Sequence, residues 1–214
     1  MNLVKRHLKR LLQPRMRQLQ RVIPLLSGES FVIADVGSTG GLDSRWAPLE
    51  SLSHVYAFDP DLRAIAGAHP NTEVLPHGLW SSEASLQLSL TRFPPASSVF
   101  EPNQDALSPF LNANCHDVVG HVPIVVRAME DALAGKPAPH FIKVDAEGAD
   151  LEILKGARSF LASSCVGVQA EVQFLERNKG SPLFAETDRL LRDLGFSLPT
   201  LGREFWIRRN AFWG

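Results

Sequence analysis

From residue 31 onward, short apolar runs that end in Gly, Asp or Pro alternate with stretches of helical periodicity. This alternation is typical of βαβ units, in which helices cover both faces of a parallel sheet. The runs predict strands at Phe31–Asp35, His54–Asp59, Glu73–Pro76, Phe141–Asp145 and Val166–Val172. The helical candidates are Ser44–Leu52, Leu62–Ala68, Leu151–Leu161 and Phe184–Leu194. We therefore expect one Rossmann-like α/β domain over residues 29–214.

Two further stretches depart from this alternation. Residues 92–123 carry five prolines among polar residues and are expected to be irregular. Ser197–Leu201 and Phe205–Arg208 flank Gly202 and predict a closing hairpin. The hairpin would end the sheet.

Residues 1–28 form a separate unit in this interpretation, a basic amphipathic helical arm. Seven basic residues precede Glu29, the first acidic one: Lys5, Arg6, Lys9, Arg10, Arg15, Arg17 and Arg21. In one interpretation the arm packs on the domain or covers its cofactor site, and its basic face is solvated. In the other, residues 3–23 make peripheral contact with an anionic membrane surface, or the arm binds an acidic substrate.

Composition narrows the classes of function. Without those seven, 15 basic residues face 23 acidic ones, so the body of the protein is acidic and no nucleic-acid partner is expected. Cys115 and Cys165 lie far apart, which indicates neither a disulfide framework nor a thiolate metal site. No apolar run reaches the roughly 18 residues of a membrane span, and a cytoplasmic location, with or without contact at the inner membrane surface, fits best.

The first predicted strand leads into a glycine-rich turn at the place where an α/β sheet presents a ligand crevice. Its candidate binding residues are Asp35, Gly37, Ser38, Thr39 and Gly40. Thr39 occupies the second glycine position of a dinucleotide fingerprint, which disfavours pyrophosphate, whereas Asp35 suits a cationic or amine-bearing ligand. An ordinary glycine-rich βα turn is the alternative.

The next two strands end in further candidate binding residues. Asp59, followed by Pro60, comes 24 residues after Asp35, near the roughly 20-residue interval at which such folds bind a ribose diol. A helix N-cap is the alternative role of Asp59. Gly78 and Leu79 follow the third strand, where small and apolar groups could flank an adenine ring.

Charged residues follow the fourth predicted strand at alternate positions: Lys143, Asp145 and Glu147. Residues two apart in a strand share a side, so these three are expected to point together, with Glu171 beside them at the end of the fifth strand. Charges at a buried strand end are costly unless they are paired or used in function. A structural ion-pair network around Lys143 is the alternative.

These segments carry a resemblance to a known family. Asp35–Gly41, Val55–Asp61 and above all Lys143–Ala157 resemble the successive motifs of FkbM-type methyltransferases, whose hallmark is similar to KxDxEGxExxxLKGA. Asp59 stands for the commoner Glu, and Asp150 for the second Glu of the hallmark. The similarity spans about residues 30–208. It implies a class I methyltransferase fold with a mostly parallel seven-stranded sheet, an antiparallel last strand and helices on both faces.

The resemblance also implies S-adenosylmethionine as cofactor and O-methylation of a sugar, glycolipid or other small metabolite. The catalytic candidates are Asp145 first, for hydroxyl binding or proton removal, then Glu147, Glu171 and Lys143. A divalent metal held by Asp145, Glu147 and Glu171 is an open alternative. Two other functions compete: a nicotinamide-dependent oxidoreductase, disfavoured by Thr39, and a non-catalytic binding module that acts through the basic arm. The acceptor's identity and the oligomeric state are not predicted.

Overall fold

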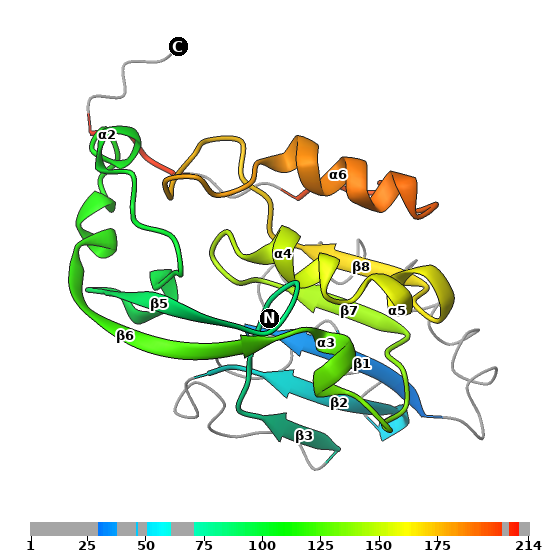
Figure 1. The fold of residues 1–214 in the computed structure, drawn as a ribbon. Coiled ribbons are helices and arrows are strands. Elements are labelled where there is room, and N and C mark those ends of the chain that lie inside the picture. The colour runs from blue at the N-terminus through cyan, green and yellow to red at the C-terminus, as the bar shows by residue number, and fades with distance from the viewer. Residues whose placement is uncertain (1–29, 38–45, 47–50, 61–70, 203–205, 210–214) are drawn as a thin grey trace, which may run out of the picture.

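Five parallel strands form the central sheet of the computed structural model, which describes residues 30–37, 46, 51–60, 71–202 and 206–209. Their spatial order is β3-β2-β1-β7-β8 (Figure 1). Their bounds are Phe31–Val36 for β1, Ser53–Phe58 for β2, Thr72–Leu75 for β3, Phe141–Val144 for β7 and Gly167–Ala170 for β8. Each lies at a predicted strand, and the mostly parallel α/β arrangement is confirmed.

The strand order reverses between β1 and β7, because the chain runs outward from β1 through β2 to β3 and then returns to the other side of β1. The register places Asp35 of β1 beside both Ala57 of β2 and Lys143 of β7. Ligands of open α/β sheets bind at such a reversal, outside the carboxyl ends of the strands. The predicted site residues at these strand ends are therefore brought to the expected edge.

A second, three-stranded sheet stands beside the first, with the order β4-β6-β5. It consists of β4 (Gly78–Leu79), β5 (Ala84–Thr91) and β6 (Val118–Arg127). The strands β5 and β6 pair in antiparallel fashion along almost their whole length. The prediction that residues 92–123 are irregular is wrong at its carboxyl end, where β6 begins at Val118.

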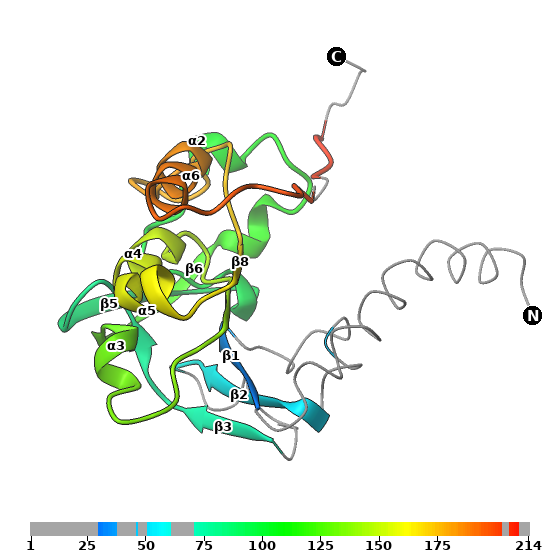
Figure 2. The same cartoon turned by 90° about the vertical axis from the view of Figure 1, so that its right-hand side faces the viewer.

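Helices α3 (Met129–Ala132), α4 (Asp150–Lys155) and α5 (Arg158–Ser163) lie on one face of the central sheet (Figure 2). Past β8 runs α6 (Phe184–Asp193), whose Leu190 and Leu191 pack against the core. The helices predicted at residues 44–52 and 62–68 fall almost entirely outside the described residues. Helices on both faces thus stay a prediction, as does the basic arm of residues 1–28, which lies wholly outside them.

The helix predicted over Leu151–Leu161 is two short helices in the structure. The break comes at Gly156, where a Cβ atom would lie 2.0 Å from the carbonyl oxygen of Trp80. Only glycine allows this approach, and Gly156 is the C-cap of α4, whose last helical hydrogen bond runs from the Gly156 N–H to the Glu152 carbonyl at 3.1 Å. The two helices supply Ile153, Leu154 and Leu161 to the core.

The predicted closing hairpin is absent from the part of it that the structure describes. Residues 197–202 form no strand, and Arg208 makes an isolated bridge to Phe110 instead. Within the described ranges the central sheet has five strands rather than the seven expected and contains no antiparallel last strand. Three shorter elements lie between β5 and β6 in the chain: the 3-10 turn η4 (Pro94–Ala96), α2 (Gln104–Leu107) and the 3-10 turn η5 (Ala113–His116).

No helix among the described residues is both long and apolar enough to cross a membrane.

Candidate active site

The ends of β1 and β7 are held together by Gly37. Its φ of +70° is in the left-handed region, and a Cβ atom there would lie 1.9 Å from the carbonyl oxygen of Asp145. Its N–H donates to the carbonyl of Phe58 in β2 at 3.0 Å. One glycine thus joins the carboxyl ends of three neighbouring strands.

Lys143 fastens the same edge through its ammonium group. The Nζ atom lies 3.2 Å from Oδ1 of the buried Asp35, and it donates to the carbonyl oxygens of Val36 at 3.2 Å and Gly37 at 2.9 Å. Oδ2 of Asp145 lies 3.8 Å away. The contacts of Lys143 therefore stabilise the ends of β1 and β7, which agrees with the alternative that Lys143 belongs to a structural ion-pair network.

Asp145 is the exposed member of this group, because 53% of its side chain is accessible. Its backbone N–H donates to Val36 O at 3.1 Å, which fixes the residue directly beyond the end of β7. Asp59 occupies the corresponding place after β2 and is buried, whereas Pro60 is exposed. Gly78 and Leu79 lie in β4 of the second sheet, where the Leu79 side chain belongs to the hydrophobic core. Ser38, Thr39 and Gly40 lie outside the described residues.

Glu147 departs from the alternation that the sequence predicts. The strand ends at Val144, and Glu147 has a φ of +49°, a left-handed conformation that is unusual for a residue with a side chain. Its carbonyl oxygen accepts two hydrogen bonds, from Ser98 Oγ at 2.7 Å and from Asn178 Nδ2 at 3.0 Å. These bonds hold the backbone in that conformation, so the side chain does not join the ion pairs of Lys143.

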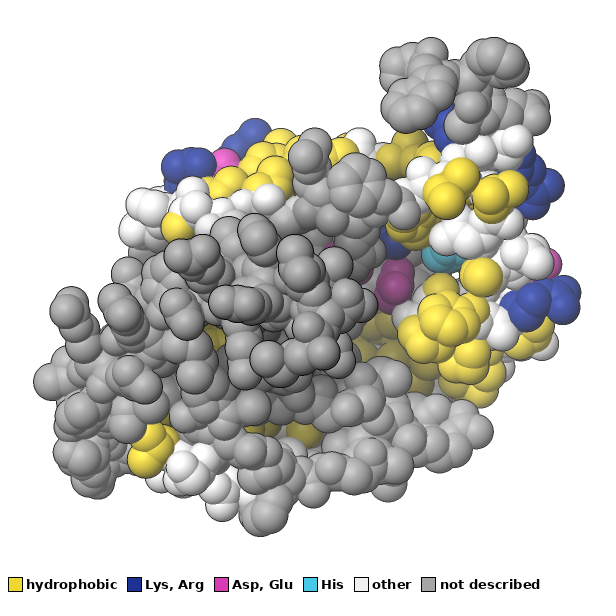
Figure 3. Space-filling view, turned by 180° about the vertical axis from the view of Figure 1, so that it is seen from behind, with side chains coloured by type: hydrophobic (Ala, Val, Ile, Leu, Met, Phe, Trp, Pro, Cys, Tyr) yellow, Lys and Arg dark blue, Asp and Glu magenta, His cyan; other side chains and the backbone are white. Residues whose placement is uncertain are grey.

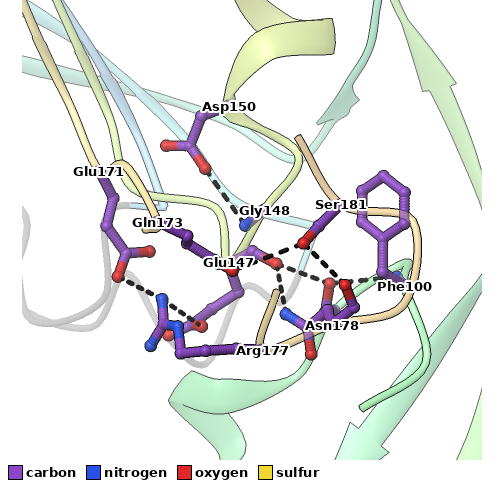
Figure 4. Close-up of polar contacts among 10 residues, drawn as sticks. Phe100, Glu147, Gly148, Asp150, Glu171, Gln173, Arg177, Asn178 and Ser181 are labelled. Atoms are coloured by element: carbon purple, nitrogen blue, oxygen red, sulfur yellow. Dashed lines mark hydrogen bonds and ion pairs between the residues drawn. The ribbon is translucent and has the colours of Figure 1, made fainter. Parts of the chain in front are cut away.

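Glu147 and Glu171 instead converge on Arg177 (Figure 4). The guanidinium Nη2 donates to Glu171 Oε1 at 2.6 Å and lies 3.6 Å from Glu147 Oε2. Glu171 follows β8 and is tied to β7 by its N–H, which donates to Val144 O at 2.9 Å. The expectation that Glu171 lies beside the β7 end is confirmed, but an arginine that sequence reasoning missed lies between the two carboxylates.

The acidic surroundings change how readily these carboxyl groups ionise. Burial, followed by the negative charge of Glu171, raises the pKa of Glu147 to about 8, although Arg177 opposes the shift. Burial and Glu171 likewise raise the pKa of Asp150 to about 7. Asp150 opens α4 and accepts the N–H of Gly148 at 3.2 Å. Both carboxyl groups therefore hold their protons to a higher pH than an exposed carboxyl group does.

Arg177 also bears on the predicted metal. A guanidinium already supplies positive charge between Glu147 and Glu171, where a cation would have to bind. Among the residues whose placement is described, no group of three or more His, Cys, Asp or Glu side chains is arranged to hold a metal ion. The described geometry thus gives the metal alternative no support.

The surface around this edge is hollowed. Figure 3 shows acidic, basic and histidine side chains together in a recess beside a group of hydrophobic side chains. A crevice of mixed polar and apolar lining at the carboxyl ends of strands is the usual form of a small-molecule site.

Comparison with known proteins assigns the chain to a family. The model of the methyltransferase FkbM domain matches residues 49–198, more than half of the chain. The crystal structure of methyltransferase FkbM from Methylobacillus flagellatus KT is similar over 62% of this chain and 30% of that one, with 19% sequence identity and a TM-score of 0.37. The similarity thus spans less than a third of the length of that protein. A comparison with curated proteins found no match.

Proposed function

Because the chain belongs to the FkbM methyltransferase family, we propose that it transfers the methyl group of S-adenosylmethionine to an acceptor hydroxyl of a sugar, glycolipid or other small metabolite. The observation that carries the proposal is the convergence of Gly37, Asp59 and Asp145 at the carboxyl edge beside the strand reversal. A cofactor that lies across this edge would meet all three.

The residues at this edge fit the cofactor chemically. The absence of a side chain at Gly37 lets the turn that follows β1 pack against the Asp145 carbonyl, so the glycine shapes the turn that a ligand would contact. Asp59 comes directly after β2, whose last residue, Phe58, is hydrogen-bonded to Gly37, and its carboxylate suits the two ribose hydroxyls. Ser38, Thr39 and Gly40 are proposed to contribute to the same turn.

S-adenosylmethionine, when bound, supplies an electrophilic methyl group on sulfur. The chain then has to orient the acceptor oxygen and to take its proton. Asp145 is the first candidate for this role, because its carboxylate is at the crevice and half exposed. Glu147 is the second, because a pKa of about 8 places its proton exchange near the working pH, and Glu171 is already engaged by Arg177.

Calorimetric titration with S-adenosylmethionine and S-adenosylhomocysteine tests the proposal. We expect micromolar binding by the wild type and its loss in Asp59→Ala. Asp117→Ala, which removes an acid from an exposed pair with Arg92, serves as the matched control and should bind normally. Binding that follows this pattern justifies an acceptor screen among glycans and glycolipids. Absence of binding by the wild type would contradict methyl transfer and favour the non-catalytic binding module.

A further inference from the structure

The end of the described chain, residues 206–209, lies against the loop that precedes β6. The Leu111 N–H donates to Ile207 O at 2.9 Å, and the Arg209 N–H donates to Pro109 O at 2.8 Å. Arg208 and Phe110 form an isolated antiparallel bridge between these two bonds. Trp206 is therefore fixed by the backbone contacts of the residues that follow it.

The Trp206 ring meets three side chains. The Cζ atom of Arg177 lies over the ring, 5.0 Å from its centroid, and the buried His116 lies 5.4 Å away at a tilt of 33°. Phe110 packs edge-on at 5.5 Å. Because a guanidinium is planar, it can stack on an indole while its in-plane N–H groups serve carboxylates. Arg177 does both, since its Nη2 contacts Glu171 and Glu147.

We propose that Trp206 and Arg177 are positioning residues for methyl transfer: the indole covers the guanidinium, which in turn holds Glu147 and Glu171 at the carboxyl edge of the sheet. This inference rests on the proposed function. Arg177 is 12% exposed, and the ring restricts a long side chain that otherwise has many rotamers. Without the ring, the guanidinium is free to leave the carboxylates for solvent.

The charged groups near the pair allow a direct readout. The pKa of Glu147 depends on four charged neighbours: Asp145, Asp150, Glu171 and Arg177. His116, which lies in η5, interacts electrostatically with Arg177. Burial and the charge of Arg177 both lower the pKa of His116, against the opposing charge of Asp117, which disfavours the charged form of this ring. Trp206 carries no charge. A change in the titration of Glu147 upon replacement of Trp206 therefore reports on where Arg177 lies.

The test is a carbon-13 NMR titration of glutamate carboxyl groups in the full chain, with the Glu147 signal assigned from Glu147→Gln. We expect Trp206→Ala and Arg177→Gln to raise the midpoint of Glu147 by about one pH unit, as loss of a close cation does. Ile207→Ala is the matched control, because its side chain is exposed while its backbone bond to Leu111 is retained. Trp206→Phe, which keeps a ring face, should restore the wild-type midpoint.

The proposal is overturned if the Glu147 midpoint is unchanged in Trp206→Ala. It is also overturned if the midpoint falls, as it would if removal of the ring only let water reach the Glu147 carboxyl group. Trp206→Leu keeps apolar bulk without a ring face and provides a second variant if the alanine protein does not fold; it should behave like alanine. Absence of both cofactor binding and turnover in the wild type would refute the proposed function, whereas the titration tests the link between Trp206 and Glu147 in either case.

A kinetic measurement tests the positioning role in methyl transfer itself. Trp206→Ala should lower kcat by about tenfold to a hundredfold, as small misplacements of reacting groups do, and leave the affinity for S-adenosylhomocysteine unchanged. Ile207→Ala should keep the wild-type kcat. A kcat that is unaffected in Trp206→Ala while the Glu147 midpoint moves would overturn the positioning role.

Discussion

Lys143 and Asp35 are register partners on the adjacent strands β7 and β1, and their charged atoms lie 3.2 Å apart. Side chains at paired positions share a face of the sheet, so the ion pair follows from the register. Because the lysine also donates to Val36 O and Gly37 O, it joins a buried carboxylate to the turn that the proposed cofactor would contact.

We expect Lys143→Met to lower the free energy of unfolding by about 3 kcal/mol, since removal of one partner of a buried pair leaves a charge without its closest compensation. Urea denaturation measures the change. Lys155→Met is the control, because Lys155 belongs to an exposed pair with Glu152, and such pairs contribute about 0.5 kcal/mol. Equal losses in the two variants would contradict a structural role for Lys143.

Gly37→Ala should destabilise the protein by more than about 4 kcal/mol or prevent folding, because the Cβ atom would overlap the Asp145 carbonyl in addition to a strained φ. Gly180→Ala separates the two effects. Gly180 has a φ of +75°, but a Cβ atom there would meet nothing within 4 Å, so only about 1 to 2 kcal/mol is expected. Thermal unfolding of both variants would show whether the close approach matters.

Ser98→Ala tests what holds Glu147 in its left-handed conformation. The hydroxyl donates to Glu147 O at 2.7 Å in a part-buried site, and its loss should destabilise the protein by about 1 to 3 kcal/mol. Ser163→Ala removes a hydroxyl that donates over the same 2.7 Å to Ser159 O on an exposed helix. A change within about 0.5 kcal/mol is expected there. Similar values for both serines would refute the bracing role of Ser98.

Stability should fall as the pH rises from about 5 to about 8. The pKa of Glu147 is raised from 4.5 to about 8 and that of Asp150 from 3.8 to about 7, both chiefly by burial. Between these limits the folded state binds more protons than the unfolded state, so the free energy of unfolding decreases with pH. We expect Glu147→Gln to reduce the decrease in the free energy of unfolding over this pH range by roughly 2 kcal/mol. Glu83→Gln, at an exposed position, is the control and should leave the decrease unchanged.

Denaturation across this pH range measures the effect. If the wild type and Glu147→Gln keep parallel profiles, Glu147 is not the group that carries the extra proton.

Asp145→Asn should lower kcat by about 10² to 10⁴, the range that general-base catalysis contributes, while S-adenosylhomocysteine binds as tightly as to the wild type. The amide retains the shape of the side chain but cannot take a proton. Asp117→Asn provides the exposed control. Near-normal turnover of Asp145→Asn would move the role of base to Glu147, for which Glu147→Gln is the corresponding variant.

The sequence alone determined the parallel sheet, because strands buried on both faces leave mostly apolar runs, as at Phe31–Val36 and Phe141–Val144, each of which contains a single charged residue. It also located Gly37, Asp59 and Asp145, since residues directly after parallel strands gather at one edge whatever the details of packing. These features depend on the hydrophobic pattern along the chain and on where each strand ends. Both can be recognised from residues that are close together in the sequence.

The tertiary structure decided the rest. Arg177 lies in a loop, and nothing near it in the sequence indicates that it would separate Glu147 from Glu171 or stack on Trp206. The alternation from Ala84 to Thr91 is a strand signal, but its partner β6 is largely exposed and carries Pro123, so its own pattern is weak. Glu147 left the predicted alternation because Ser98 and Asn178, 49 and 31 residues away along the chain, bind its carbonyl. Contacts between segments far apart in the sequence determine where Arg177, β6 and Glu147 lie. The hydrophobic pattern within one segment does not predict such contacts.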